Sequence, residues 1–165
     1  MILGMTIQVF IHVVVSLIAI VAGFVVLAGL FKARPLEGWT AWFLILSVAT
    51  SLTGVVLPAT QILPSHITAI VALAVLLVTV PAKYTFDMHG GWRKVYVIGA
   101  VISLYLNVFV LIVQAFLKVP ALKALAPTGS EAPFAIVQGL VLLGFIINGY
   151  LAVKRFAPRD VLTSA

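Results

Sequence analysis

The hydrophobic residues of this chain fall into five long runs separated by short stretches that carry most of the charge. The runs cover about residues 6–31, 39–63, 66–82, 95–117 and 134–153. A helix needs about 20 predominantly apolar residues to cross the hydrocarbon core of a bilayer. The pattern therefore predicts an all-α polytopic membrane bundle of five transmembrane helices, forming a single transmembrane domain over residues 1–165.

The breaks between the runs contain residues that end helices or resist burial in lipid. Lys32 to Pro35 joins charge to a proline, and the polar stretch from Lys83 to Lys94 contains paired glycines. The longest break, residues 118–133, holds three prolines, which confine any helix there to a short surface turn. A four-span arrangement is disfavoured because neither the second nor the third run has the charged face of a surface helix.

Composition supports the same class of protein. Hydrophobic residues make up 64% of the chain and charged residues 8%, with a mean hydropathy of +1.28, whereas soluble domains carry about 25% charged residues. The formal charge of +6 comes from basic residues beside the spans, where they meet lipid headgroups, so we expect no nucleic-acid partner. With no cysteine, disulfides and thiolate metal sites are excluded.

The basic residues also predict an orientation. Eight of the ten Lys and Arg residues follow the first, third and fifth runs, and only Lys118 and Lys123 follow the fourth. By the positive-inside rule, the N-terminus lies outside and the C-terminus lies in the cytoplasm.

Polar residues within the runs are the candidates for function. Several of them fall in the outer half of the predicted membrane, and Asn107 lies on the same run as Gln114. The candidate pocket residues are His12, Gln61, His66, Asn107, Gln114 and Gln138. Such residues often serve helix packing, because amides hydrogen-bond across helices. Since a polar group at membrane depth needs a partner or water, they could instead line an outward-facing pocket for a small apolar or amphipathic ligand, or contact a membrane partner.

Two alternative functions stay open. His12 and His66 could be the axial ligands of a b-type haem in a redox protein, although His12 lies about 9 Å into its span while His66 begins one. The chain could also be a small transporter or channel subunit, which would require a homo-oligomer because five spans enclose little space.

Catalysis is disfavoured, and no metal site is predicted. All four acidic residues lie in loops or near a terminus, so no intramembrane carboxylate is available for acid–base chemistry or proton coupling. Neither a Ser–His–Asp arrangement nor an HExxH motif is evident.

The C-terminal 70 residues resemble small bacterial inner-membrane proteins to which no activity is assigned. The similarity lies in WRKVY at residues 92–96, YLNVFVLIVQAFLKVPAL at 105–122 and APTGSEAPF at 126–134. It implies a location in the bacterial inner membrane and a packed helical bundle, and it carries no activity with it.

Overall fold

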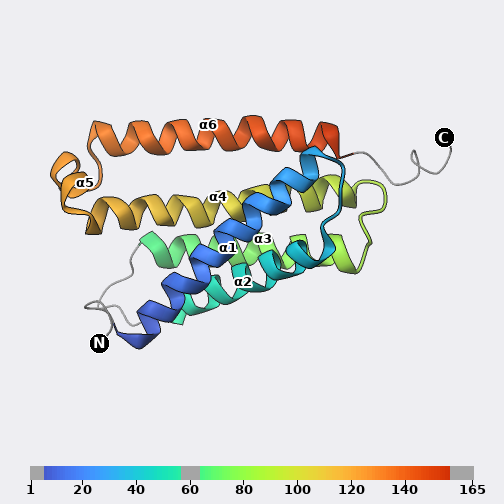
Figure 1. Ribbon diagram of the computed structural model, residues 1–165, viewed down its shortest axis with the longest axis horizontal. Coiled ribbons are helices and arrows are strands. Elements are labelled where there is room, and N and C mark those ends of the chain that lie inside the picture. The colour runs from blue at the N-terminus through green and yellow to red at the C-terminus, as the bar shows by residue number, and fades with distance from the viewer. Residues whose placement is uncertain (1–5, 57–63, 157–165) are drawn as a thin grey trace.

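The computed structural model describes residues 6–56 and 64–156, and within them every regular element is a helix (Figure 1). The helices are α1 (Ile7–Phe31), α2 (Glu37–Val56), α3 (Pro64–Tyr84), α4 (Trp92–Lys118), α5 (Pro120–Leu125) and α6 (Ala132–Arg155). All except the six-residue α5 are long and apolar enough to cross a membrane. The predicted all-α bundle with five candidate transmembrane helices is confirmed, and a helix suits lipid because it satisfies its own backbone hydrogen bonds.

The helix ends differ from the predicted ones by a few residues. The second predicted span continued to residue 63, whereas α2 is described to Val56 and residues 57–63 lie outside the described part of the chain. The third predicted span ended at residue 82, whereas α3 includes Pro81 and continues to Tyr84. Proline lacks the N–H that would bond to the carbonyl group four residues earlier, so α3 continues past Pro81 with one backbone hydrogen bond fewer.

Helix α4 starts three residues before its predicted boundary and includes two charged residues in its first turn. One of them, Arg93, donates from Nη1 to the carbonyl oxygens of Val153, at 3.1 Å, and of Phe156 at the end of α6. These carbonyls have no partner inside α6 and carry the negative end of its dipole. The arginine is therefore stabilised at this position, and it ties the start of α4 to the end of α6.

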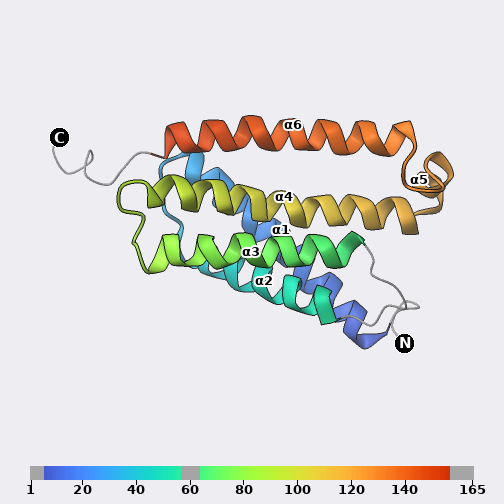
Figure 2. The ribbon, with the colours of Figure 1, turned by 180° about the vertical axis from the view of Figure 1, so that it is seen from behind.

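Helices α1 to α4 pack around one another, and α6 lies outside them. Helix α1 contacts α2 and α4, α3 contacts the same two helices, and α6 packs against α4 and α1. Figure 2 shows this arrangement from behind, with α6 as a separate outer layer. Only Gln138 and Ala152 of α6 are buried, so most of this helix faces outward.

The two ends of the bundle differ in charge. We call the end with the 32–36 and 85–91 connections and the C-terminus of α6 the basic end, and the opposite end, with α5, the open end (Figure 1). The basic residues described at the basic end are Lys32, Arg34, Lys83, Arg93, Lys94, Lys154 and Arg155. Lys118 and Lys123 lie at the open end.

Gly23 of α1 packs closely against side chains of α2 and α4. A Cβ at this position would lie 2.6 Å from Cδ1 of Leu104 and 2.8 Å from Cε2 of Phe43. Both of those side chains are almost fully buried, so the α1 backbone is held directly against α2 and α4. All buried residues of α1 lie from Ala19 onward, which means that its first three turns contribute nothing to the core.

Helices α3 and α4 approach closely at Gly99. A Cβ there would lie 2.0 Å from Oγ1 and 3.0 Å from Cβ of Thr79. The Thr79 hydroxyl donates to the carbonyl oxygen of Val75 at 2.7 Å, so its rotamer is already fixed. Only glycine fits at residue 99 without displacing α3.

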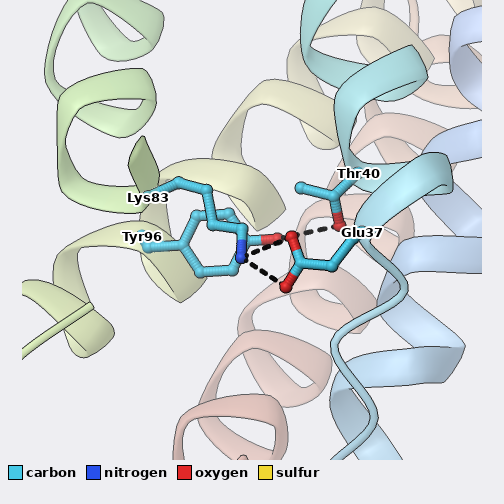
Figure 3. A network of polar contacts seen from close by, with 4 residues as sticks. All are labelled: Glu37, Thr40, Lys83 and Tyr96. Atoms are coloured by element: carbon cyan, nitrogen blue, oxygen red, sulfur yellow. Dashed lines mark hydrogen bonds and ion pairs between the residues drawn. The ribbon is translucent and has the colours of Figure 1, made fainter. Parts of the chain in front are cut away.

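A polar network joins three helices at the basic end (Figure 3). Nζ of Lys83 lies 2.8 Å from each carboxylate oxygen of Glu37, joining the end of α3 to the start of α2. Beside this pair, the hydroxyl groups of Thr40 and Tyr96 lie 3.4 Å apart. The Lys83 side chain is 4% exposed and that of Glu37 is 52% exposed, so the carboxylate is needed to stabilise a buried ammonium group.

The close approach at Gly99 predicts a large effect of a single methyl group. Gly99→Ala should lower the melting temperature of the detergent-solubilised protein, with a cost of roughly 1–3 kcal/mol from overpacking. Gly144→Ala is the matched control, because no atom lies within 4 Å of a Cβ at that position. The control should be neutral or slightly stabilising, since alanine favours the helix. Equal melting temperatures for the two variants would contradict the described packing of α3 on α4.

The buried lysine predicts an asymmetric response to mutation. Glu37→Gln should destabilise the bundle by about 1–2 kcal/mol, because it leaves the Lys83 ammonium group buried without its carboxylate, although the exposure of Glu37 moderates the loss. Adding Lys83→Met to that variant should recover most of the stability by removing the buried charge. Thermal unfolding of the single and double variants measures this difference, and a double variant less stable than Glu37→Gln would contradict it.

Candidate functional site: a cavity among four helices

A cavity of about 570 Å³ lies among α1, α2, α3 and α4 in the half of the bundle nearest the open end. This volume falls within the range of about 300–1,000 Å³ that is typical of small-molecule sites. Its polar lining residues are His12, Ser16, Thr50, Ser51, His66, Thr68, Asn107, Gln114 and Lys118. Most of the remaining wall is aliphatic, with residues such as Val9, Ile20 and Leu106.

The cavity exists because the first half of α1 diverges from α4 (Figures 1 and 2). Helix α1 is held against its neighbours at Gly23, and its first turns lie well apart from α4 in both views (Figures 1 and 2). Since no residue before Ala19 on α1 is buried, the space between the first half of α1 and the second half of α4 is only partly filled. The rim includes Leu17 and Leu111, each about two-fifths exposed, so the cavity reaches the outer surface of the bundle.

The His12 ring is oriented by a hydrogen bond to α2. Its Nδ1 atom lies 2.8 Å from Oγ1 of Thr53, and that oxygen also lies 2.8 Å from the carbonyl oxygen of Ala49. A carbonyl oxygen can only accept, so the single hydroxyl hydrogen of Thr53 is directed to the backbone, and Nδ1 of His12 carries the hydrogen that it donates to Thr53. We therefore assign the Nδ1–H tautomer, which leaves Nε2 as a hydrogen-bond acceptor.

The deeper wall of the cavity holds unused hydrogen-bonding capacity. Asn107 of α4 donates from Nδ2 to Oγ of Ser47 on α2 at 3.2 Å, which links the two helices. The Thr50 hydroxyl, one turn further along α2, is buried and has no hydrogen-bond partner among the described residues. A buried hydroxyl without a partner costs about 1–3 kcal/mol, so a polar atom of a ligand or a water molecule would be stabilised here.

The structure brings together four of the six residues predicted to form a pocket. His12, His66, Asn107 and Gln114 all line this one cavity, although they come from α1, α3 and α4. Gln61 lies outside the described residues. These four side chains therefore share one space.

Gln138 does not belong to this group, and its predicted place in the pocket is corrected. Its side chain is buried between α6 and α4, where Nε2 donates to the carbonyl oxygen of Phe109 at 3.2 Å. Helix α6 packs on the outside of the bundle, so a residue on its inner face meets the side of α4 that faces away from the cavity. Its role in the structure is helix packing.

Sequence reasoning missed three threonines and a lysine at this site. Thr50 and Thr68 line the cavity, Thr53 orients His12, and Lys118 lies at the rim. Threonines in apolar helices commonly bond to their own backbone, which made them poor candidates. The spacing of Thr50 and Gly54, one turn apart on α2, is a sequence signal that could have indicated the first of these threonines.

Comparison of the chain with protein-family models, curated proteins and solved structures finds no match. The geometry of the cavity is therefore the basis for the functional argument.

The assigned tautomer of His12 can be tested by ¹⁵N NMR of protein with labelled histidines. The His12 signals, identified by their loss in His12→Ala, should be those of a protonated Nδ1 and an unprotonated Nε2. Thr53→Val should abolish this tautomer preference, because it removes the acceptor for Nδ1–H, whereas Thr85→Val in an exposed connection should leave it intact. A wild-type ring protonated on Nε2 alone would contradict the assignment.

Proposed function

We propose that this chain is a bacterial inner-membrane protein that binds a small amphipathic molecule, without chemical conversion, in the cavity among α1 to α4. The observation that carries the proposal is a cavity of about 570 Å³ with mostly apolar walls and a buried Thr50 hydroxyl in its wall that has no partner among the described residues. Apolar walls with a few convergent polar groups are typical of ligand sites.

The lining supports a particular chemistry for the ligand. Nε2 of His12 accepts a hydrogen bond, so it matches a hydroxyl or N–H group, and the Thr50 hydroxyl can accept or donate. Aliphatic residues around these groups match a hydrocarbon body. Lys118 at the rim would suit a polar or anionic group pointing toward the open end.

The route of entry supports a ligand that partitions into the membrane. Leu17 and Leu111 at the rim are exposed on faces of helices that are apolar enough to lie in lipid. A molecule dissolved in the bilayer could reach the cavity between α1 and α4 without crossing a polar surface. No carboxylate lines the cavity among the described residues, so the contacts on offer there are hydrogen bonds and apolar surface.

The proposed orientation puts the open end, and with it the cavity, on the outer side of the membrane. Seven of the nine described Lys and Arg residues lie at the basic end, and cytoplasmic loops carry the excess of basic residues in inner-membrane proteins. The N-terminus is then outside and the C-terminus cytoplasmic.

Native mass spectrometry of the protein purified in mild detergent tests the proposal. A small molecule should co-purify with the wild type, and Val110→Trp, which fills the cavity wall, should lose it. Val141→Trp is the matched control on α6, away from the cavity. Thr50→Val should weaken retention by about fivefold to tenfold, the effect of one hydrogen bond. The same molecules retained by Val110→Trp as by the control would overturn the proposal.

A b-type haem protein is a second candidate, favoured by the location of His12 and His66 in one cavity. The Nδ1–H of His12 is held by Thr53, and a fixed donor on one ring nitrogen is the usual arrangement when the other ligates a metal. Protein purified from haem-replete cells should then be red and lose its absorption bands in His12→Ala or His66→Ala. Colourless protein would exclude this candidate.

The transporter or channel interpretation, and the oligomer that it needs, stay predictions.

A further inference from the structure

A second, smaller concavity of about 370 Å³ lies between α4 and α6, outside the four-helix core. Its walls are apolar side chains of the two helices, including Ile98 and Ile102 of α4 and Ile146 of α6. The two backbones approach closely at Gly149, where a Cβ would lie 3.3 Å from Cγ1 of Val101. We call this surface the α4–α6 groove.

The groove has the length of one leaflet of a bilayer. On α6 its lining extends over the twelve residues from Leu142 to Val153, which span about 16 Å along the helix. Half of a hydrocarbon core of about 30 Å is about 15 Å. Near the middle of the bundle, the rings of Tyr105 and Phe145 meet edge to face at 5.6 Å, so an aromatic pair lies in the wall of the groove at about the depth where one leaflet meets the other.

Two lysines lie where the groove reaches the basic end. Lys154 directly follows Val153, and its Nζ lies 4.7 Å from the centroid of the Tyr150 ring, which is part of the groove wall. Lys94 lies one helical turn before Ile98, on the same side of α4. Both lysines are exposed, and neither forms an ion pair within the described residues.

Three other cations of the basic end have contacts of their own. Arg93 donates to the last carbonyl groups of α6, and Lys83 is paired with Glu37. The Arg155 guanidinium lies 5.8 Å from the centroid of the Phe31 ring, toward α1. Lys94 and Lys154 lie at the mouth of the groove without an ion-pair partner among the described residues, and the Arg93 contacts hold the two helix ends together there.

We propose that the α4–α6 groove is a binding site for an anionic phospholipid of the surrounding bilayer. One acyl chain lies along the groove, and the headgroup phosphate lies between Lys94 and Lys154. The apolar walls complement hydrocarbon, the length matches one leaflet, and the paired lysines complement the negative charge that distinguishes this lipid from a zwitterionic one. This proposal does not depend on the cavity among α1 to α4 or on what binds there.

The test uses the purified full-length chain and two lipids with the same dioleoyl chains, phosphatidylglycerol and phosphatidylcholine, titrated in native mass spectrometry. The wild type should bind phosphatidylglycerol about tenfold more tightly, since each lysine near a phosphate contributes about a fivefold preference at most. The double variant Lys94→Gln/Lys154→Gln should reduce the preference to about one. The control Lys32→Gln/Lys123→Gln removes the same charge outside the groove and should retain it.

A third variant tests the acyl-chain part of the site. Ile102→Trp fills the groove and should weaken binding of both lipids while leaving the protein monodisperse in gel filtration. Four results would each overturn the proposal. These are equal affinities of the wild type for the two lipids, a preference that survives loss of both groove lysines, an equal loss of preference in the control, and unchanged binding in Ile102→Trp.

Discussion

The contact of the α1 backbone at Gly23 with Phe43 and Leu104 is the constraint on which the rest of the bundle depends. In a bilayer the apolar surfaces of helices gain little from being removed from lipid, so close packing and interhelical hydrogen bonds hold helices together. A glycine that seats two large side chains directly on its helix provides such packing. Because this contact lies in the half of α1 nearest the basic end, the helix is fixed there and diverges toward the open end, where the cavity forms.

Polar groups at the basic end and in the cavity differ in how completely they are hydrogen-bonded. At the basic end the buried ammonium of Lys83 has both oxygens of Glu37, and Arg93 has the last carbonyl groups of α6. In the cavity the Thr50 hydroxyl has no partner among the described residues, and our assignment leaves Nε2 of His12 as an acceptor. Unmet hydrogen bonds in an apolar setting are costly. Of the described residues, Ser103 and Gln138 also have a buried side-chain oxygen without a partner, but Thr50 is the one that lines the cavity.

Helix α6 gives the protein a second kind of surface. Because it packs on the outside of α4 and α1, it creates a groove without enlarging the core. Its residues Gln138 and Ala152 reach inward, while most of its length faces the region that lipid would occupy. Two concave surfaces in so small a bundle therefore arise from two packing events, the divergence of α1 and the peripheral placement of α6.

The sequence alone determined the class of the protein, because the length and hydropathy of each run depend only on local composition. It determined the helix ends to within a few residues. The errors at the end of α3 and the start of α4 arose where the helix continues past Pro81 and where Arg93 finds carbonyl partners at the end of α6. Only the tertiary structure decided which polar residues share a space. Gln114 and Gln138 look alike in sequence, yet the first lines the cavity and the second packs between α4 and α6. That difference is set by how each helix is rotated and where it crosses its neighbours, and contacts such as Gly23 with Leu104 fix those crossings between residues far apart in the chain.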